Sequence, residues 1–156
     1  MTRIPIELDT VYHVYNRGVD KRDVFMEDGD YLRFIHYLYH CNNKTNTPNL
    51  TFYLNDSPSL ETPPDQLLKQ PIPREPLVDI FAFVLMPNHF HLMLQERVEG
   101  GISTFMQRIG TGHTMFFNEK HQRSGALFQG KFKYKAVFHE AQLLYLPHYI
   151  HLNPLP

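Results

Sequence analysis

The chain has 156 residues, the length of one domain, and 42% of them are hydrophobic, which is enough for one core. Its formal net charge of −1 excludes a globally basic nucleic-acid binder, so any nucleic-acid surface has to be a local patch. The single cysteine, Cys41, excludes an internal disulfide and a cysteine-based zinc site. No apolar run approaches the roughly 20 residues of a membrane span, and the N-terminus lacks a signal-peptide core. We therefore expect a cytoplasmic protein without a membrane partner.

The N-terminal part of the chain predicts a strand followed by a helix. Residues Val11–Asn16 alternate along a β-rich run and predict a strand, after which residues 17–22 form a basic loop. Asp28 can cap a helix that continues to about Cys41. This helix is predicted by apolar residues at the spacing i, i+3, i+4, i+7, namely Tyr31, Phe34, Ile35 and Leu38.

Residues 43–76 differ in composition from the rest of the chain. Seven of the 12 prolines lie here, and few apolar residues recur with a period. We expect an extended insertion with a short β-segment at 50–54. A loop of this length is unusual inside a small domain. It is either a functional flap or dispensable, and we favour the second interpretation.

The second half of the chain predicts a β-hairpin first. Val78–Leu85 and His89–Gln95 are strands joined by a tight turn, in which Pro87 supplies the fixed φ and Asn88 tolerates the next position. The elements that follow are a helix over 102–116, a strand over 131–138, and a helical tract over 140–153 with a break or kink near Pro147.

This order is β-α-β-β-α-β with one additional C-terminal helix. It predicts an α+β fold of the ferredoxin-like, split βαβ type over the single domain 1–156, with an antiparallel sheet and two helices on one face. Phe90, Leu92 and Leu94 would meet those helices, because successive strand residues point to opposite faces. His89 and His91 would then face the other side, which only the last helix is left to cover.

Two imidazoles that converge on one point are the start of a metal site. Tyr149 and Asn153 are spaced i, i+4 and share a helix face. If that face lies over the histidines, His89, His91 and Asn153 form a three-ligand site with open positions for Mg²⁺ or Mn²⁺. Tyr149 would lie one turn away, where a cation lowers the pKa of its phenol, so that it can attack a phosphodiester and form a covalent phosphotyrosine.

Each of these assignments has an alternative in the sequence. The histidine pair can be the solvent-facing side of an edge strand, and Tyr149 can be a packing tyrosine, with Tyr145 on the same helix face. Asn153 precedes a proline and is equally a residue that ends a helix. Further alternatives are His151, which we rank below Asn153 as a ligand, and His13, which is either a group supporting the site or an ordinary sheet histidine.

The motif Met-Pro-Asn-His-Phe-His-Leu at 86–92 resembles the histidine-hydrophobe-histidine (HUH) motif of single-tyrosine transposases of the IS200/IS605 type. The resemblance is closest to their domesticated relatives, the REP-associated tyrosine transposases. Further similar segments lie in the same order as in that family and make the resemblance specific, whereas the histidine pair alone is a weak signal. These segments are 12–18, 123–133 and 149–154.

The resemblance implies a metal-dependent transposase and endonuclease that cleaves and rejoins single-stranded DNA next to a hairpin. Tyr149 takes the place of the nucleophile, which forms a 5′-phosphotyrosine and frees a 3′-OH. His89 and His91 match the metal-binding pair, and Asn153 matches the third ligand. The family includes homodimers that exchange the tyrosine helix as well as proteins that act alone, so both states stay open. Relatives often continue past this point, and we expect the chain to be truncated at its C-terminus.

Basic side chains gather in two groups, one after the first predicted strand and one around the last. Both groups can contact DNA phosphates, and neighbouring aromatic rings can stack on unpaired bases. The alternative for the lysines near residue 133 is an ordinary solvated strand edge. Arg108 and His113 are expected to face solvent or DNA. The predicted DNA-binding residues are Arg17, Lys21, Arg22, Arg123, Lys131, Lys133 and Lys135.

Two other functions compete with the transposase. One is a non-catalytic, ferredoxin-like nucleic-acid-binding module whose histidine pair is vestigial or structural. The other is a metal-dependent hydrolase with a water nucleophile, which would form no covalent intermediate and would tolerate Tyr149→Phe.

Overall fold

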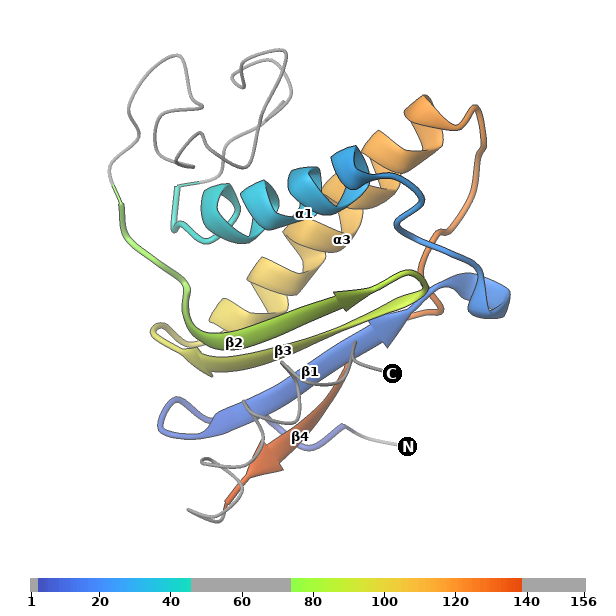
Figure 1. The fold of residues 1–156 in the computed structure, drawn as a ribbon. Helices are drawn as coiled ribbons and strands as arrows, with labels where there is room; N and C mark the ends of the chain where they lie inside the picture. Colours follow the sequence, from blue (N-terminus) through green and yellow to red (C-terminus); the bar gives the residue numbers. More distant parts are fainter. Residues whose placement is uncertain (1–2, 46–73, 139–156) are drawn as a thin grey trace.

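A computed structural model describes residues 3–45 and 74–138 of the chain. The predicted β-segment at 50–54 and the C-terminal helical tract therefore lie outside the described residues. The described elements are β1 (Val11–Arg17), the short 3₁₀-helix η1 (Val19–Lys21), α1 (Asp28–His40), β2 (Val78–Met86), β3 (His89–Glu96), α3 (Gly101–Lys120) and β4 (Lys133–Val137) (Figure 1).

The four strands form one sheet in the order β2-β3-β1-β4, and each neighbouring pair is antiparallel. Helices α1 and α3 lie together on one face of this sheet (Figure 1). The architecture confirms the predicted ferredoxin-like α+β fold. Within the described residues, no helix is long and apolar enough to cross a membrane.

The core lies between the sheet and the two helices. Tyr12 and Val14 of β1 are buried on this face, as are Phe90, Leu92 and Leu94 of β3. The alternation of these strands puts every second side chain into the core, as the sequence predicts. The helices contribute fully buried residues to the same cluster, chiefly Phe34, Ile102, Phe105, Ile109 and Phe117.

The two ends of the predicted insertion are fixed to each other. The Asn42 side chain accepts hydrogen bonds from the backbone amides of Leu77 and Val78, both at 2.9 Å. The amide of Lys44 donates to the carbonyl of Glu75 at 2.8 Å. Contacts between described residues therefore hold together the two segments that flank residues 46–73.

Three predicted boundaries are wrong by a few residues. Asp28 is the first residue of α1 and does not cap it. The cap is Glu27, which forms a capping box with Asp30. Helix α3 continues past residue 116 to Lys120. Strand β4 begins only at Lys133, because residues 128–131 belong to a turn in which the amide of Gly130 donates to the carbonyl of Phe128.

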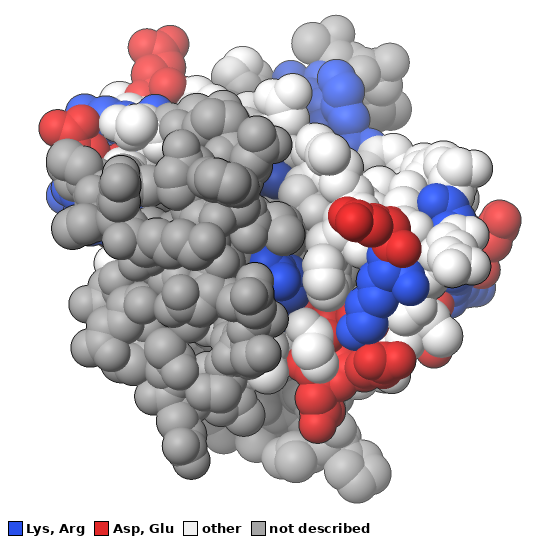
Figure 2. All heavy atoms as spheres, turned by 90° about the horizontal axis from the view of Figure 1, so that it is seen from above, with Lys and Arg blue, Asp and Glu red and all other residues white. Residues whose placement is uncertain are grey.

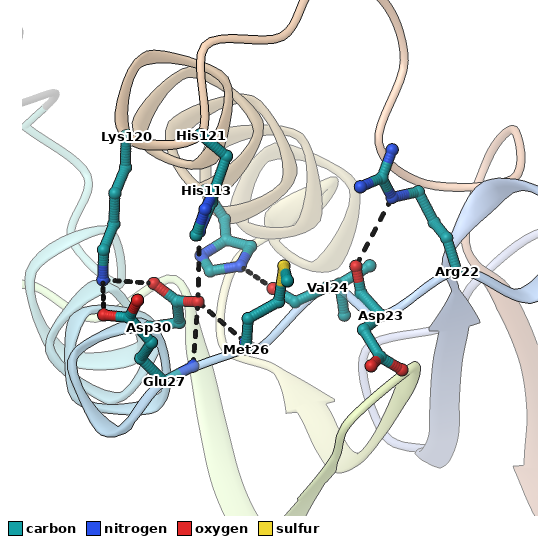
Figure 3. Close-up of polar contacts among 9 residues, drawn as sticks. All are labelled: Arg22, Asp23, Val24, Met26, Glu27, Asp30, His113, Lys120 and His121. Atoms are coloured by element: carbon teal, nitrogen blue, oxygen red, sulfur yellow. Dashed lines mark hydrogen bonds and ion pairs between the residues drawn. The ribbon is translucent and has the colours of Figure 1, made fainter.

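A buried polar network joins the start of α1 to the end of α3 (Figure 3). The Asp30 carboxylate is fully buried and accepts hydrogen bonds from the amides of Met26 and Glu27 at 2.8 and 3.2 Å. Lys120 pairs with Asp30 at 2.8 Å and with Glu27 at 3.1 Å. Viewed over the helices, acidic and basic side chains are interspersed on the described surface (Figure 2). Among the described residues, no extended patch of one sign is seen in this view.

His113 was expected to face solvent or DNA, and that prediction is wrong. Its side chain is fully buried, and its Nε2 atom lies 2.7 Å from the carbonyl oxygen of Val24, to which it can donate (Figure 3). The ring packs against Phe25 and Phe34, with centroids 5.0 and 5.3 Å away. Burial lowers the pKa of His113 to about 4. The residue is therefore a neutral part of the core.

The low pKa of His113 predicts a loss of stability in mild acid. Its pKa is about 4 in the folded protein and near 6.5 without burial, so the unfolded chain binds the extra proton first as the pH falls. The free energy of unfolding should decrease from pH 6.5 downwards, with His113 contributing a loss of roughly 3 kcal/mol by pH 4. Urea unfolding at pH 7 and pH 4.5 should show a smaller decrease for His113→Gln than for the wild type. Equal decreases would contradict this assignment.

Candidate functional site

His89 and His91 lie on the face of the sheet that points away from α1 and α3. Their neighbours on β3, Phe90 and Leu92, are buried on the helix side, so alternation sends both imidazoles to the opposite face. The two ring centroids are 5.1 Å apart. Because β3 pairs with β2 on one side and with β1 on the other, the alternative of an edge strand is wrong.

The Nδ1 atom of His89 is oriented by the residue before it. It lies 2.7 Å from Oδ1 of Asn88, and the Asn88 amide nitrogen donates to the carbonyl of Lys21 at 3.3 Å. With the amide held in this way, Oδ1 can only accept, so His89 carries its proton on Nδ1. The Nε2 atom then keeps a free lone pair, which is the form that binds a metal.

The Nδ1 atom of His91 is also engaged, by a side chain on the neighbouring strand. It lies 2.9 Å from Nε2 of His13. Tyr15 shares this face of the sheet, with its ring centroid 5.0 Å from that of His13 and 6.0 Å from that of His91. His13 was one of the alternatives in the sequence. Its alternation with Tyr12 and Val14 was the signal that pointed to this face.

Burial keeps both members of the pair neutral. It lowers the pKa of His89, and it lowers that of His91 more strongly, to about 4. For His91, repulsion from the protonated forms of His13 and His89 adds to the effect of burial. A neutral imidazole is the ligand form. The donors thus fit a divalent cation, but residues 3–45 and 74–138 contain no group of three His, Cys, Asp or Glu side chains that could hold one. The pair needs at least one more ligand from another part of the chain, from water or from substrate.

The other predicted residues of the chemistry lie outside the described residues. These are Tyr149 as nucleophile and Asn153 as third ligand, together with the alternatives Tyr145 and His151. Their roles stay predictions.

The first basic group, residues 17–22, lies against the turn at Pro87-Asn88, which directly precedes the two histidines of β3. Arg17 is the register partner of His89. The amide of Gly18 donates to the carbonyl of Asn88 at 2.9 Å. A side chain at position 18 would collide with the carbonyl oxygen of Arg22, so the loop requires glycine here.

The second basic group lies in the segment 123–135, and this segment is hydrogen-bonded to the first group. The amide of Gln129 donates to the carbonyl of Arg17 at 2.8 Å, and the Gln129 side chain accepts from the Arg17 guanidinium at 2.7 Å. The guanidinium groups of Arg22 and Arg123 lie 5.5 and 6.0 Å from the ring of Phe117. In the described part of the chain, neither arginine forms an ion pair with a carboxylate. The structure thus brings Arg17, Lys21 and Arg22 to the end of the sheet where β3 begins. Arg123 lies with Arg22 over the ring of Phe117, at the end of α3.

The lysines near β4 divide between the two faces. Lys133 and Lys135 are exposed and pair in register with Tyr15 and His13, so they lie on the face of the histidines. Lys131 was predicted to share that strand face, but it precedes β4 and lines a groove of about 1010 Å³ on the helix side. Since β4 is an edge strand of the described sheet, the alternative of a solvated edge stays open for Lys133 and Lys135.

Comparison with known proteins places these features in a family context. Residues 66–153, more than half of the chain, match a family model described as "Transposase IS200 like". No curated protein matches the sequence. Among solved structures, the chain is similar to "Structure of the REP associates tyrosine transposase bound to a REP hairpin", with a TM-score of 0.61 and 15% identity over 99% of this chain and 72% of the other. At that identity the likeness concerns the fold alone.

Proposed function

Since this chain belongs to the IS200-like transposase family, we propose that it is a metal-dependent strand transferase and endonuclease that cleaves and rejoins single-stranded DNA next to a hairpin. The observation that carries the proposal is the histidine pair. His89 and His91 lie on one face of the sheet, and the Nδ1 atom of each contacts a neighbouring side chain, so the two Nε2 atoms are the positions at which a cation would bind.

His89 and His91 would hold Mg²⁺ or Mn²⁺, with Asn153 as the third ligand. When bound there, the cation would polarise a phosphate oxygen of the DNA. Tyr149 would supply the nucleophile. Its phenolic oxygen would attack the phosphorus of the scissile phosphodiester and lose its proton to solvent. The bond from phosphorus to the 3′-oxygen would break, and the leaving 3′-oxygen would take up a proton from solvent. The products are a 5′-phosphotyrosine and a free 3′-OH, and the covalent link conserves the phosphodiester for rejoining.

The cationic end of the sheet would hold the DNA backbone beside the histidines. Arg17, Lys21 and Arg22 lie at this end, and Arg123 lies with Arg22 over the ring of Phe117. Lys133 and Lys135 extend the charge along the face of His13. Such a patch allows a nearly neutral protein to bind DNA, with an affinity that decreases with salt. The structurally similar transposase is described as bound to a REP hairpin, and we propose a hairpin with a single-stranded flank as the ligand of this chain.

A labelled oligonucleotide tests the proposal. A pool of DNA hairpins with randomised single-stranded flanks is incubated with the protein and Mg²⁺ or Mn²⁺, then separated on a denaturing gel. A label at the 3′ end should move with the protein, because the protein is joined to the 5′ side of the cleaved product. A label at the 5′ end should appear on a shortened strand that a polymerase can extend. Chelation of the metal should abolish both products.

The competing functions predict different gels. A hydrolase with a water nucleophile would shorten the strand without any protein–DNA adduct. A non-catalytic binding module would retard the pool on a native gel and cleave it with neither metal. Either result would contradict the proposal.

A further inference from the structure

We propose that His13 is a positioning residue that directs the metal-binding lone pair of His91. The inference rests on the proposed function, since it concerns how the chain prepares His91 for a divalent cation. His13 would accept a hydrogen bond from Nδ1–H of His91 and would not itself bind the cation.

The hydrogen bond between these two rings couples the tautomer of His91 to that of His13. The nitrogen atoms are 2.9 Å apart, and the ring planes are inclined by 31°. Two neutral imidazoles share one proton in such a contact. If His91 donates from Nδ1, its Nε2 atom is free for a metal. If His13 donates from Nε2, the proton of His91 is on Nε2 and blocks that site. His13 as acceptor is therefore the state that matches a metal-binding His91.

The neighbouring histidine shows the same arrangement with an unambiguous acceptor. Nδ1 of His89 lies 2.7 Å from Oδ1 of Asn88, whose amide nitrogen donates to the carbonyl of Lys21. Both histidines thus have Nδ1 held by a side chain, and no described residue forms a hydrogen bond with either Nε2. Hydrogen bonding to the second nitrogen is how proteins commonly orient a metal-binding histidine.

The strand that carries His13 holds it firmly in place. β1 pairs with β3 on one side and with β4 on the other, and Tyr15 of β1 is the direct register partner of His91. His13 is two residues before Tyr15, so it approaches His91 diagonally across the strand pair, within reach of a long side chain. The exposed Lys135 is its register partner on β4. A cation at that position does not compete for the His91 proton.

Replacement of His13 should weaken metal binding without unfolding the protein. His13→Phe keeps a planar ring and removes the acceptor, and we expect Mn²⁺ affinity, measured from the electron paramagnetic resonance signal of free Mn²⁺, to decrease about 10- to 100-fold. His13→Gln retains an acceptor and should recover most of this loss. Tyr15→Phe is the matched control, because Tyr15 also borders both rings without a hydrogen bond to either, and it should bind Mn²⁺ like the wild type.

A second readout reports the tautomer directly. Long-range ¹⁵N–¹H correlation spectra of the metal-free protein should show His91 protonated on Nδ1 in the wild type and shifted towards the Nε2–H form in His13→Phe. His89 should be unchanged in both. Unchanged Mn²⁺ affinity in His13→Phe would overturn the inference. So would a third imidazole on the bound metal in pulsed spectra of the wild type, because His13 would then be a ligand.

The same measurements separate this inference from the proposed function. If His89→Ala and His91→Ala leave Mn²⁺ binding unchanged, the metal site itself is wrong and both proposals fail. If those two variants lose Mn²⁺ while His13→Phe retains it, the metal site stands and only the positioning role of His13 is overturned.

Discussion

Replacing Tyr149 by phenylalanine is expected to abolish the covalent protein–DNA adduct while leaving DNA binding within about twofold of the wild type. The substitution removes one oxygen atom, which in the proposed mechanism is the nucleophile. The cationic groups at the end of the sheet, which would contact phosphates, are untouched. The 3′-labelled hairpin pool on a denaturing gel measures the adduct, and a native gel at matched salt measures binding.

Two other tyrosines serve as matched controls for the nucleophile. Tyr15→Phe is the first, because among the described residues this tyrosine has its ring 6.0 Å from the ring of His91. Tyr145→Phe is the second, because its spacing puts it on the same predicted helix face as Tyr149. Both should form the adduct at close to the wild-type rate. An adduct that persists in Tyr149→Phe and disappears in one of the controls would transfer the role to that residue.

Much of this fold can be predicted from local patterns. Strict alternation around Phe90 and Leu92 fixes both the strand and its buried face, and Pro87-Asn88 fixes the turn, so the hairpin was predicted to within one residue at each end. The order of the predicted elements then leads to the sheet order, since a β-α-β-β-α-β chain has few ways to cover one face of a sheet.

Features that depend on tertiary contacts were not predictable. His113 lies one helical turn after Ile109 and one turn before Phe117, both of which are fully buried. What the sequence does not show is the acceptor for its imidazole within the core, which is the carbonyl of Val24. Likewise, the alternation at residues 131–138 predicts a strand from residue 131 onwards. It does not reveal that the preceding turn is hydrogen-bonded to Arg17, so that β4 begins only at Lys133.

In the candidate site, too, some features follow from local sequence patterns and others depend on tertiary contacts. That His89 and His91 share a face follows from their i, i+2 spacing on a strand. The 2.9 Å contact between His13 and His91 depends on the register between β1 and β3, which the sequence of neither strand specifies alone. A shift of that register by one residue would turn His13 to the opposite face relative to His91.

Removing the histidine pair should have the other large effect. In the double variant His89→Ala, His91→Ala, we expect cleavage of the hairpin pool to decrease by at least about 10³-fold, which corresponds to roughly 4 kcal/mol of transition-state stabilisation. The reason is that both Nε2 lone pairs that would bind the cation are lost at once. DNA binding at matched salt should change little, because the basic residues of the loops lie outside the substitution.

The single variants and a remote histidine make this test specific. If the two imidazoles hold one cation, His89→Ala and His91→Ala should each cause most of the loss of cleavage, and the double variant should add little, because groups that act as one unit are not additive. His121→Ala removes an imidazole at the end of α3, beside Asp30 and on the helix side of the sheet, and should cleave like the wild type (Figure 3). Independent, additive losses in the two single variants, with Mn²⁺ affinity unchanged, would show that the histidines contact the DNA separately and would contradict a shared cation.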